Sequence, residues 1–298
     1  VEYGNIAAAL RPLRELYGRG RVADFTPPML KTVRERMVAA GLARTTVNSR
    51  VKIVRRMFKW GVGEGLVDPM VHHGLTAIDG LKRGRSEARD TDPVKPVPDA
   101  HVEAALQHLT PTVAAMVRVQ VLTGMRPAEL CSMTSGAIDT SAEVWVFTPH
   151  HHKTAHHGHD RRVFIGPRAQ EVLRPYLRHE LDAPCFQPRE SAAEARRRDA
   201  TGQRRPGQRP NPRETERQVG DRYDVPAYRR AIHRACDRAG VPRWSPNRLR
   251  HNFATELRRD YGIEAAQTAL GHRMGSAITE TYAEQNRDRA REIIARVG

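Results

Sequence analysis

Three features are scarce or missing in this sequence of 298 residues, and each excludes a class of protein. Only three cysteines occur, Cys131, Cys185 and Cys236, and they lie far apart. Their spacing matches neither a paired metal site nor a disulfide framework, so we expect a reduced, intracellular protein. No apolar run approaches the roughly 18 residues of a membrane span, and no signal-peptide pattern opens the chain. The sequence therefore predicts a globular protein without a membrane partner.

Acidic residues are also in deficit. The chain has 50 Lys and Arg against 34 Asp and Glu, which gives a net charge of +16 and a pI of about 10.6. Residues 1–92 and 93–298 are net positive by 7 and 9, so no single basic tail carries the excess. An arginine-rich genome accounts for part of it. Nucleic-acid binding is the interpretation we favour, because cations that contact phosphates release condensed counterions.

The length allows two domains, and residues 1–82 read as the first, an all-helical one. Its third helix, predicted over 45–59, has an apolar stripe on one face. That stripe consists of Val47, Val51, Val54, Met57 and Phe58. The other faces carry five cations and no acid, namely Arg50, Lys52, Arg55, Arg56 and Lys59. A charged face is usually only solvated, but this one would also suit a helix that lies along a phosphate backbone. Because the chain opens with Val1 and not with Met, we expect a fragment.

Residues 83–98 are charged, proline-rich and without periodicity, which predicts a linker before a second domain over 99–298. In that domain, segments 143–147 and 162–165 read as the two strands of a hairpin. Helices are predicted over 228–239, 247–259 and 263–270, whereas the low-complexity segment 187–222 is predicted to be a loose insertion. The fold class that follows is mainly α with one small antiparallel sheet (α+β).

Two arginines stand in distinctive frames. Arg126 lies in Thr-Gly-Met-Arg-Pro-Ala-Glu-Leu, between the end of one helix and the start of the next, where Glu129 can orient it or cap the helix. Arg250 lies inside a predicted helix. Guanidinium groups bind phosphate oxygens bidentately, and they would also stabilise the anion of a tyrosine such as Tyr282, whose phenol has a pKa of about 10 when free. Lys153, at the tip of the predicted hairpin, could protonate a leaving oxygen.

In these motifs, together with Leu-Gly-His at 270–272, the chain resembles the tyrosine recombinases, or phage-type integrases, over about residues 93–298. The resemblance implies a helical SAM-like core-binding domain followed by a DNA breaking-rejoining catalytic domain. It assigns Tyr282 as the nucleophile that forms a 3′-phosphotyrosyl link, with Arg126, Lys153, Arg250 and His272 as the other catalytic residues. Neither a metal nor another cofactor is implied.

One position departs from the family pattern. The family usually has His three residues before the second arginine, where this chain has Asn247. An amide still donates a hydrogen bond but does not titrate near neutral pH. We favour an active enzyme in which Asn247 is a catalytic donor; a slower enzyme, or a protein that binds DNA without cutting it, are the other two interpretations. His251, one turn along, is expected to pack internally.

The resemblance also predicts the partners and the job. We expect double-stranded DNA as the substrate and a homo-oligomer, a tetramer on two DNA sites, in a prokaryotic cytoplasm and associated with the nucleoid. Integration or excision of a mobile element is the expected role. The alternatives are a non-catalytic DNA-binding relative and a type IB topoisomerase. The tail at 286–297, with Ile293, Ile294 and Val297, would suit docking on a neighbouring protomer, which a monomeric topoisomerase does not need.

A histidine cluster surrounds Lys153, and His-rich tracts can bind zinc. Its members are His150, His151, His152, His156, His157 and His159. It has no accompanying Cys and no helical i, i+4 pair, so a solvated loop beside DNA phosphate is the preferred interpretation and no metal is expected.

Overall fold

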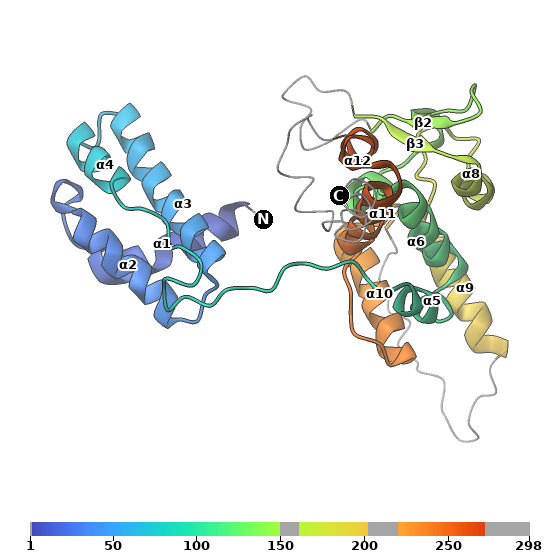
Figure 1. Cartoon of the computed structure of the whole chain (residues 1–298), viewed down its shortest axis with the longest axis horizontal. Coiled ribbons are helices and arrows are strands. Elements are labelled where there is room, and N and C mark those ends of the chain that lie inside the picture. Colours follow the sequence, from blue (N-terminus) through green and yellow to red (C-terminus); the bar gives the residue numbers. More distant parts are fainter. Residues whose placement is uncertain (1, 150–160, 202–219, 272–298) are drawn as a thin grey trace, which may run out of the picture. The chain divides into compact units, whose positions relative to one another are not determined.

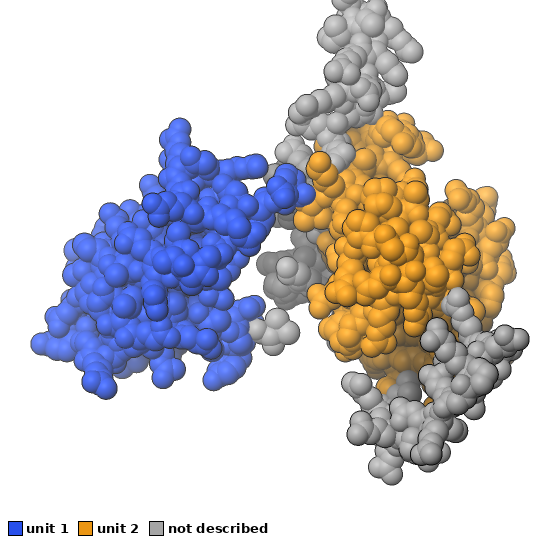
Figure 2. All heavy atoms as spheres, turned by 90° about the horizontal axis from the view of Figure 1, so that it is seen from below, with its two compact units in different colours: residues 1–93 blue, residues 94–298 orange. Residues whose placement is uncertain are grey.

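The computed structural model describes residues 2–149, 161–201 and 220–271. The chain divides into two compact units, Val1–Pro93 and Val94–Gly298, which Figure 2 shows in blue and orange. Within the described residues, no helix has both the length and the apolar character needed to cross a membrane.

Unit 1 is helical and packs around one apolar core. Its elements are α1 (Glu2–Tyr17), η1 (Val22–Asp24), α2 (Pro27–Ala39), α3 (Arg44–Gly63) and α4 (Pro69–Thr76). The predicted apolar face of α3 is confirmed: Val47, Val51, Val54 and Phe58 are buried, and Met57 is half-buried and packs against them. The helix extends beyond the predicted end at residue 59 to Gly63, and it includes Gly61. A Cβ at position 61 would lie 2.6 Å from Cγ2 of Val67, so this glycine lets the chain return closely along its own helix.

The segment predicted as a linker is held at both of its ends. On the side of unit 1, Arg44 Nε donates to Asp90 Oδ1 at 2.6 Å, and Ala88 is buried. On the side of unit 2, Val97 is buried and its backbone N–H and carbonyl both bind the side-chain amide of Asn252, at 2.7 and 2.6 Å. The boundary between the units lies at Pro93–Val94, between these two attachments.

Unit 2 is mainly α with a three-stranded antiparallel sheet, which confirms the predicted fold class. Its first half comprises α5 (Asp99–Leu106), α6 (Pro111–Thr123), α7 (Pro127–Cys131), η2 (Ser135–Ala137), β1 (Ile138–Asp139), β2 (Trp145–Phe147) and β3 (Val163–Ile165). Its second half comprises α8 (Pro167–Leu173), η4 (Arg174–Tyr176), α9 (Pro188–Thr201), α10 (Val225–Ala239), α11 (Asn247–Tyr261) and α12 (Ile263–Leu270).

Helix α6 is the centre of unit 2. It packs against α7, α8, α9, α11 and β3, and Figure 1 shows it amid the helices of this unit. Most of its side chains are buried. The sheet has the order β1-β2-β3, with Trp145 opposite Ile165 and Phe147 opposite Val163, so the predicted hairpin is confirmed. The inward residues of β2 and β3 are buried, and Phe164 between them is exposed. This alternation fixes the register of the strands that flank Lys153 in the sequence.

The expectation of a loose insertion over 187–222 does not hold for residues 188–201. They form α9, whose Glu194 accepts hydrogen bonds from Thr112 N (3.1 Å) and Thr112 Oγ1 (2.9 Å) at the start of α6. Arg178 and Glu190 form an ion pair at 2.6 Å, and Ser191 is hydrogen-bonded to Thr110. Polar anchors therefore replace the apolar stripe whose absence suggested disorder. Residues 202–219 of the predicted insertion lie outside the described part of the chain.

Candidate active site

The Arg126 frame begins with a tight turn at the end of α6. Gly124 ends the helix in the left-handed conformation (φ +61°), and a Cβ there would lie 2.1 Å from Cδ1 of Phe253 on α11. Only glycine fits this approach. Gln120 Nε2 donates to the carbonyl of buried Met125 at 3.1 Å, and Pro127 then opens α7. The side chain of Arg126, 30% exposed, is thus held at the junction of two helices.

Glu129 is the buried anion of this junction, with a side chain only 3% exposed. Its carboxylate accepts from Arg126 N and from Arg126 Nη1, both at 2.8 Å, so it caps α7 and orients the arginine at once. It also accepts from Arg161 Nε at 3.1 Å and Arg161 Nη2 at 3.3 Å. Burial raises the pKa of Glu129, but Arg161 and Arg126 outweigh that effect and lower it to about 2. The carboxylate is therefore charged near neutral pH, and the three groups together carry a net charge of +1.

Arg161 was not among the residues predicted from the sequence. It precedes β3 and is 3% exposed, whereas its neighbour Arg162 points to solvent. Both arginines occur in one charged stretch with no periodic signal that separates them. Arg161 differs from Arg162 because the fold brings Glu129, 32 residues earlier in the chain, into contact with it.

Arg250 is fully buried on α11 and connects the ends of two other helices. Its Nη1 donates to the carbonyl of Gly124 and its Nη2 to the carbonyl of Leu270, both at 2.7 Å. Leu270 ends α12, and Gly271 follows in the left-handed conformation (φ +63°). The arginine motifs at 123–130 and 247–250 and the beginning of the Leu-Gly-His motif therefore meet around one guanidinium.

Asn247 is the first residue of α11 and is half-buried. It precedes Arg250 by three residues, so both lie on the same side of the helix. His251, in the next turn, is buried, as expected. The beginning of α11 is anchored by Arg248, which donates to the carbonyls of Lys95 (2.8 Å) and Pro96 (3.0 Å). Asn247 therefore stands on a fixed helix end.

Several predicted catalytic positions lie outside the described residues. These are Lys153, His272 and Tyr282, together with the histidine cluster and the tail at 286–297. In the part of the chain that is described, no group of three or more His, Cys, Asp or Glu could hold a metal ion.

Comparison with known families shows which family the chain matches. The model of the phage integrase family matches residues 99–289, which include every predicted catalytic residue. The chain belongs to the phage integrase family. The resemblance to the tyrosine-type DNA recombinases is thereby confirmed, and with it the enzyme class.

Individual relatives agree with this assignment. The tyrosine recombinase XerC of Mycobacterium sp. (strain KMS) is 26% identical over 290 residues, covering 91% of this chain and 82% of the relative. Among solved structures, a λ integrase (75–356) dimer bound to a COC′ core site has a TM-score of 0.65 at 13% identity, covering 93% of this chain and 86% of that one. The Tn1549 transposon integrase with circular intermediate DNA has a TM-score of 0.63 at 16% identity, covering 95% and 89%. These structures share the fold.

The cations predicted on the third helix of this integrase-family protein are divided by their exposure. Lys52, Arg56 and Lys59 are exposed, whereas Arg50 and Arg55 are half-buried beside the core stripe. Thr45 and Ser49 are exposed as well. Together with the three exposed cations they follow one another at alternating spacings of four and three residues. These five residues form one polar face of α3 with hydroxyl and cationic donors, here named the α3 stripe. The hydroxyl part of the α3 stripe was missed from the sequence.

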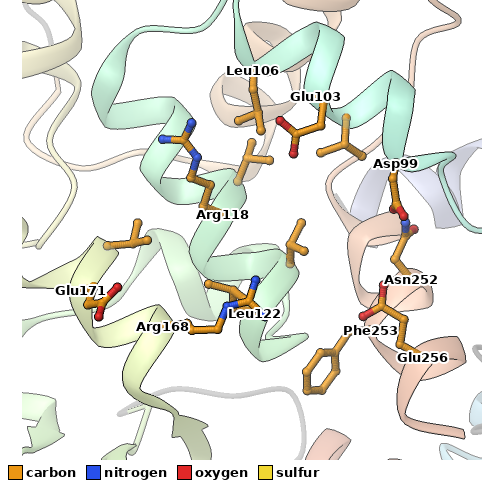
Figure 3. Close-up of a pocket in the computed structure, with 14 residues that line it drawn as sticks. Asp99, Glu103, Leu106, Arg118, Leu122, Arg168, Glu171, Asn252, Phe253 and Glu256 are labelled. Carbon is orange, nitrogen blue, oxygen red and sulfur yellow. The ribbon is translucent and has the colours of Figure 1, made fainter. Parts of the chain in front are cut away.

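A groove of about 770 Å³ lies on unit 2 between α5, α6, α8 and α11 (Figure 3). None of Arg126, Arg161 and Arg250 lines it. Its charged lining consists of Asp99, Glu103, Arg118, Arg168, Glu171 and Glu256. Burial and the nearby Asp99 raise the pKa of Glu256 above its usual value. With four carboxyl groups against two guanidiniums, this groove is a poor site for a DNA phosphate.

Proposed function

We propose that this protein cleaves and rejoins DNA strands with Tyr282 as the nucleophile, and that it integrates or excises a mobile element. The observation that carries the proposal is the Arg250 guanidinium, which joins the Arg126 turn to the Leu270 helix end. Three segments distant in the sequence thus meet at one cation, which supports a phosphate site there. Family membership supports the same reaction class.

The chemistry is a transesterification at phosphorus. The phenol oxygen of Tyr282 attacks the scissile phosphate, the 5′-oxygen leaves and takes a proton, and a 3′-phosphotyrosyl link remains. A 5′-hydroxyl then attacks the link and releases the tyrosine. Since the link keeps the energy of the phosphodiester, neither ATP nor a metal is needed. We assign proton donation to the leaving oxygen to Lys153.

Arg126 and Arg250 neutralise the phosphate in this scheme, with His272 as a further donor. Charge develops on the non-bridging oxygens in the transition state, and preorganised guanidinium groups stabilise it. Arg126 suits this role because its half-exposed side chain is oriented by Glu129. Arg250 suits it because two hydrogen bonds to the carbonyls of Gly124 and Leu270 fix its guanidinium beside the Arg126 turn.

Asn247 acts as a hydrogen-bond donor to the phosphate and not as a base. Its position three residues before Arg250, at the N-terminus of α11, favours a contact with an anion. The proton of Tyr282 then has to leave by another route. We expect an active enzyme. The slower enzyme is the alternative, and it would show the loss of about 10²–10⁴-fold that a missing general acid–base group typically causes.

Double-stranded DNA is the proposed partner of both units, because each is net positive. The α3 stripe is the proposed contact of unit 1 with the phosphate backbone. Exchange between two duplexes requires cleavage of four strands, and with one tyrosine per protomer this requires a tetramer on two DNA sites. The λ integrase dimer on its core site supports assembly on DNA.

The test is capture of the covalent intermediate. A target duplex is selected from a random pool by binding to the protein, and a nicked form of it is incubated with the protein so that cleavage releases a short fragment and traps the adduct. We expect a protein–DNA adduct on a denaturing gel that disappears in Tyr282→Phe. No adduct from the parent protein, despite DNA binding, would support the non-catalytic relative; an adduct that persists in Tyr282→Phe would reject the assigned nucleophile. Relaxation of supercoiled plasmid without the selected site would support the topoisomerase.

A further inference from the structure

Arg161 has no role in the reaction described above, yet its guanidinium is fixed in place on several sides. Nε and Nη2 bind Glu129 at 3.1 and 3.3 Å, and Nη1 donates to the carbonyl of Arg162 at 2.9 Å. With the side chain 3% exposed, solvent hardly reaches it. Each nitrogen of the guanidinium has an acceptor, so both its position and its plane are determined.

The same guanidinium lies against the backbone of Gly271. A Cβ at position 271 would be 2.6 Å from Arg161 Nη1 and 3.3 Å from its Cδ. Gly271 directly follows Leu270, whose carbonyl binds Arg250, and directly precedes His272 in the sequence. Arg161 therefore contacts Glu129, whose carboxylate orients Arg126. It also lies against Gly271, which stands in the sequence between Leu270, a partner of Arg250, and His272.

We propose that Arg161 is a positioning residue of the active site: through Glu129 it fixes Arg126, and through Gly271 it fixes the C-terminal end of α12 relative to Arg126. The inference rests on the proposed function, because it concerns the same phosphate site. Each guanidinium nitrogen of Arg161 already binds Glu129 or the carbonyl of Arg162, so no contact with DNA is assigned to it. A displacement of about 1 Å in such a site can slow a reaction by about a hundredfold, so a residue that acts only on position has a measurable effect.

Electrostatics give this role a signature that a purely structural residue lacks. The charged groups facing Glu129 are Arg126 and Arg161, and together they keep its carboxylate ionised against the effect of burial. Without Arg161, only Arg126 opposes burial, and the pKa of Glu129 rises. Protonation of Glu129 would then release Arg126, so cleavage would become sensitive to acid in a range where the parent is not.

The test follows adduct formation on the nicked duplex in single turnover between pH 5.5 and 8.5, together with DNA affinity and thermal unfolding. For Arg161→Met we expect adduct formation at least about tenfold slower at neutral pH, with a further loss toward acid pH and a DNA affinity within twofold of the parent. Adding Glu129→Gln should abolish the acid loss. Arg161→Lys keeps the charge, so it should lack the acid loss and recover part of the rate. The exposed neighbour provides the control: Arg162→Met also removes one cation but leaves the contacts of Arg161 with Glu129 and Gly271 in place, so it should keep the pH profile of the parent.

The outcomes separate the two proposals. Equal rates and pH profiles for Arg161→Met and the parent would overturn the positioning role and leave the proposed function intact. A loss of DNA affinity and cleavage in parallel would also overturn it, because that pattern indicates a merely structural role. If Arg161→Met does not fold, the neutral pair Glu129→Gln/Arg161→Met is compared with Glu129→Gln, since buried ion pairs often tolerate joint replacement. A parent that forms no adduct at all would reject the proposed function, and the positioning role with it, before any variant is measured.

Discussion

The buried arginines of unit 2 and the exposed lysines of unit 1 are all cationic, but they have different roles. Arg161 and Arg250 are ordered by hydrogen bonds to a carboxylate or to backbone carbonyls, and little or no water reaches them. Lys52 and Lys59 stand in solvent on α3. A buried guanidinium fixes geometry, and its removal leaves orphaned polar groups. An exposed ammonium contributes charge, which salt screens. The net charge of +16 therefore combines residues that build the site with residues that attract its substrate.

Within unit 2 the two types of acceptor differ as well. Arg126 and Arg161 share the carboxylate of Glu129, so their position depends on an ionised group. Arg250 binds two carbonyls, which do not titrate. The Arg126 side of the site consequently depends on a carboxylate that stays ionised until the pH falls toward 2, and the Arg250 side depends on helix ends.

The largest effect on stability is expected for Arg250→Met. The change leaves the buried carbonyls of Gly124 and Leu270 without this donor, at a cost of about 1–3 kcal/mol each, so we expect a loss of about 4 kcal/mol in the free energy of unfolding. Adduct formation should be lost as well. Denaturant unfolding measures the first effect, and the nicked duplex measures the second.

Arg248→Met is the matched control for that change. Arg248 also donates to two carbonyls from the same helix, but it is half-buried and its contact with Lys95 is exposed to water. Because water can replace the lost donor, we expect less than about 1 kcal/mol. Equal losses in the free energy of unfolding for Arg250→Met and Arg248→Met would show that burial does not determine how much such an arginine contributes to stability.

Glu129→Gln should reduce stability in a pH-dependent way. The pKa of Glu129 is lowered from 4.5 to about 2 by the folded state, so its ionised form stabilises the protein above pH 4.5, and this contribution is lost as the pH falls toward 2. The shift corresponds to about 3 kcal/mol at pH 7 and to about half of that at pH 3. The difference between parent and variant in denaturant unfolding should narrow accordingly. Glu103→Gln removes an exposed carboxyl and should change stability little at any pH; a Glu129→Gln difference that stays constant from pH 7 to pH 3 would contradict the ion-pair account.

The parts of the fold that local sequence patterns determine could be predicted from the sequence. The apolar stripe of α3 recurs at helical spacing, and the two strands that flank Lys153 are short runs of β-branched and aromatic residues. Helix α9 has no such stripe, and it is held by Glu194 and Glu190, whose partners lie in other elements. Its prediction as a loose segment failed because a tertiary contact, and not a local propensity, decides the structure there.

The site shows the same limit. Arg126 and Arg250 were found because each stands in a distinctive motif. Arg161 has no motif, and it is buried only because the fold brings Glu129 and Gly271 to it. The steric need for Gly124 likewise comes from Phe253, 129 residues later in the chain. Contacts of this kind have no signature in a single sequence.

Asn247→His sharpens the contrast between a fixed donor and a titratable group. If Asn247 already donates to the phosphate, a histidine adds only a route for the tyrosine's proton, and we expect adduct formation to rise about tenfold at neutral pH, equivalent to about 1.4 kcal/mol. The gain should decline below the histidine pKa of about 6.5, where the ring can no longer accept a proton. The measurement is the single-turnover rate against pH, with Asn247→Ala as the variant that loses the donor. An Asn247→Ala rate equal to that of the parent would show that Asn247 does not act on the phosphate.

The smallest change in stability, under about 0.5 kcal/mol, is expected for the exposed cations, where only charge is removed. Lys52→Ala/Lys59→Ala should leave folding intact and weaken DNA binding. If both lysines contact phosphates, the slope of log affinity against log salt should decrease by about 1.8, or about 0.9 for each contact. Lys31→Ala/Arg36→Ala removes two exposed cations from α2 of the same unit and controls for net charge. A slope changed equally by both pairs would mean that the charge of unit 1 acts as a whole; a slope changed only by the α3 pair would locate the phosphate contact on the α3 stripe, because a diffuse field does not distinguish two helices of one small domain.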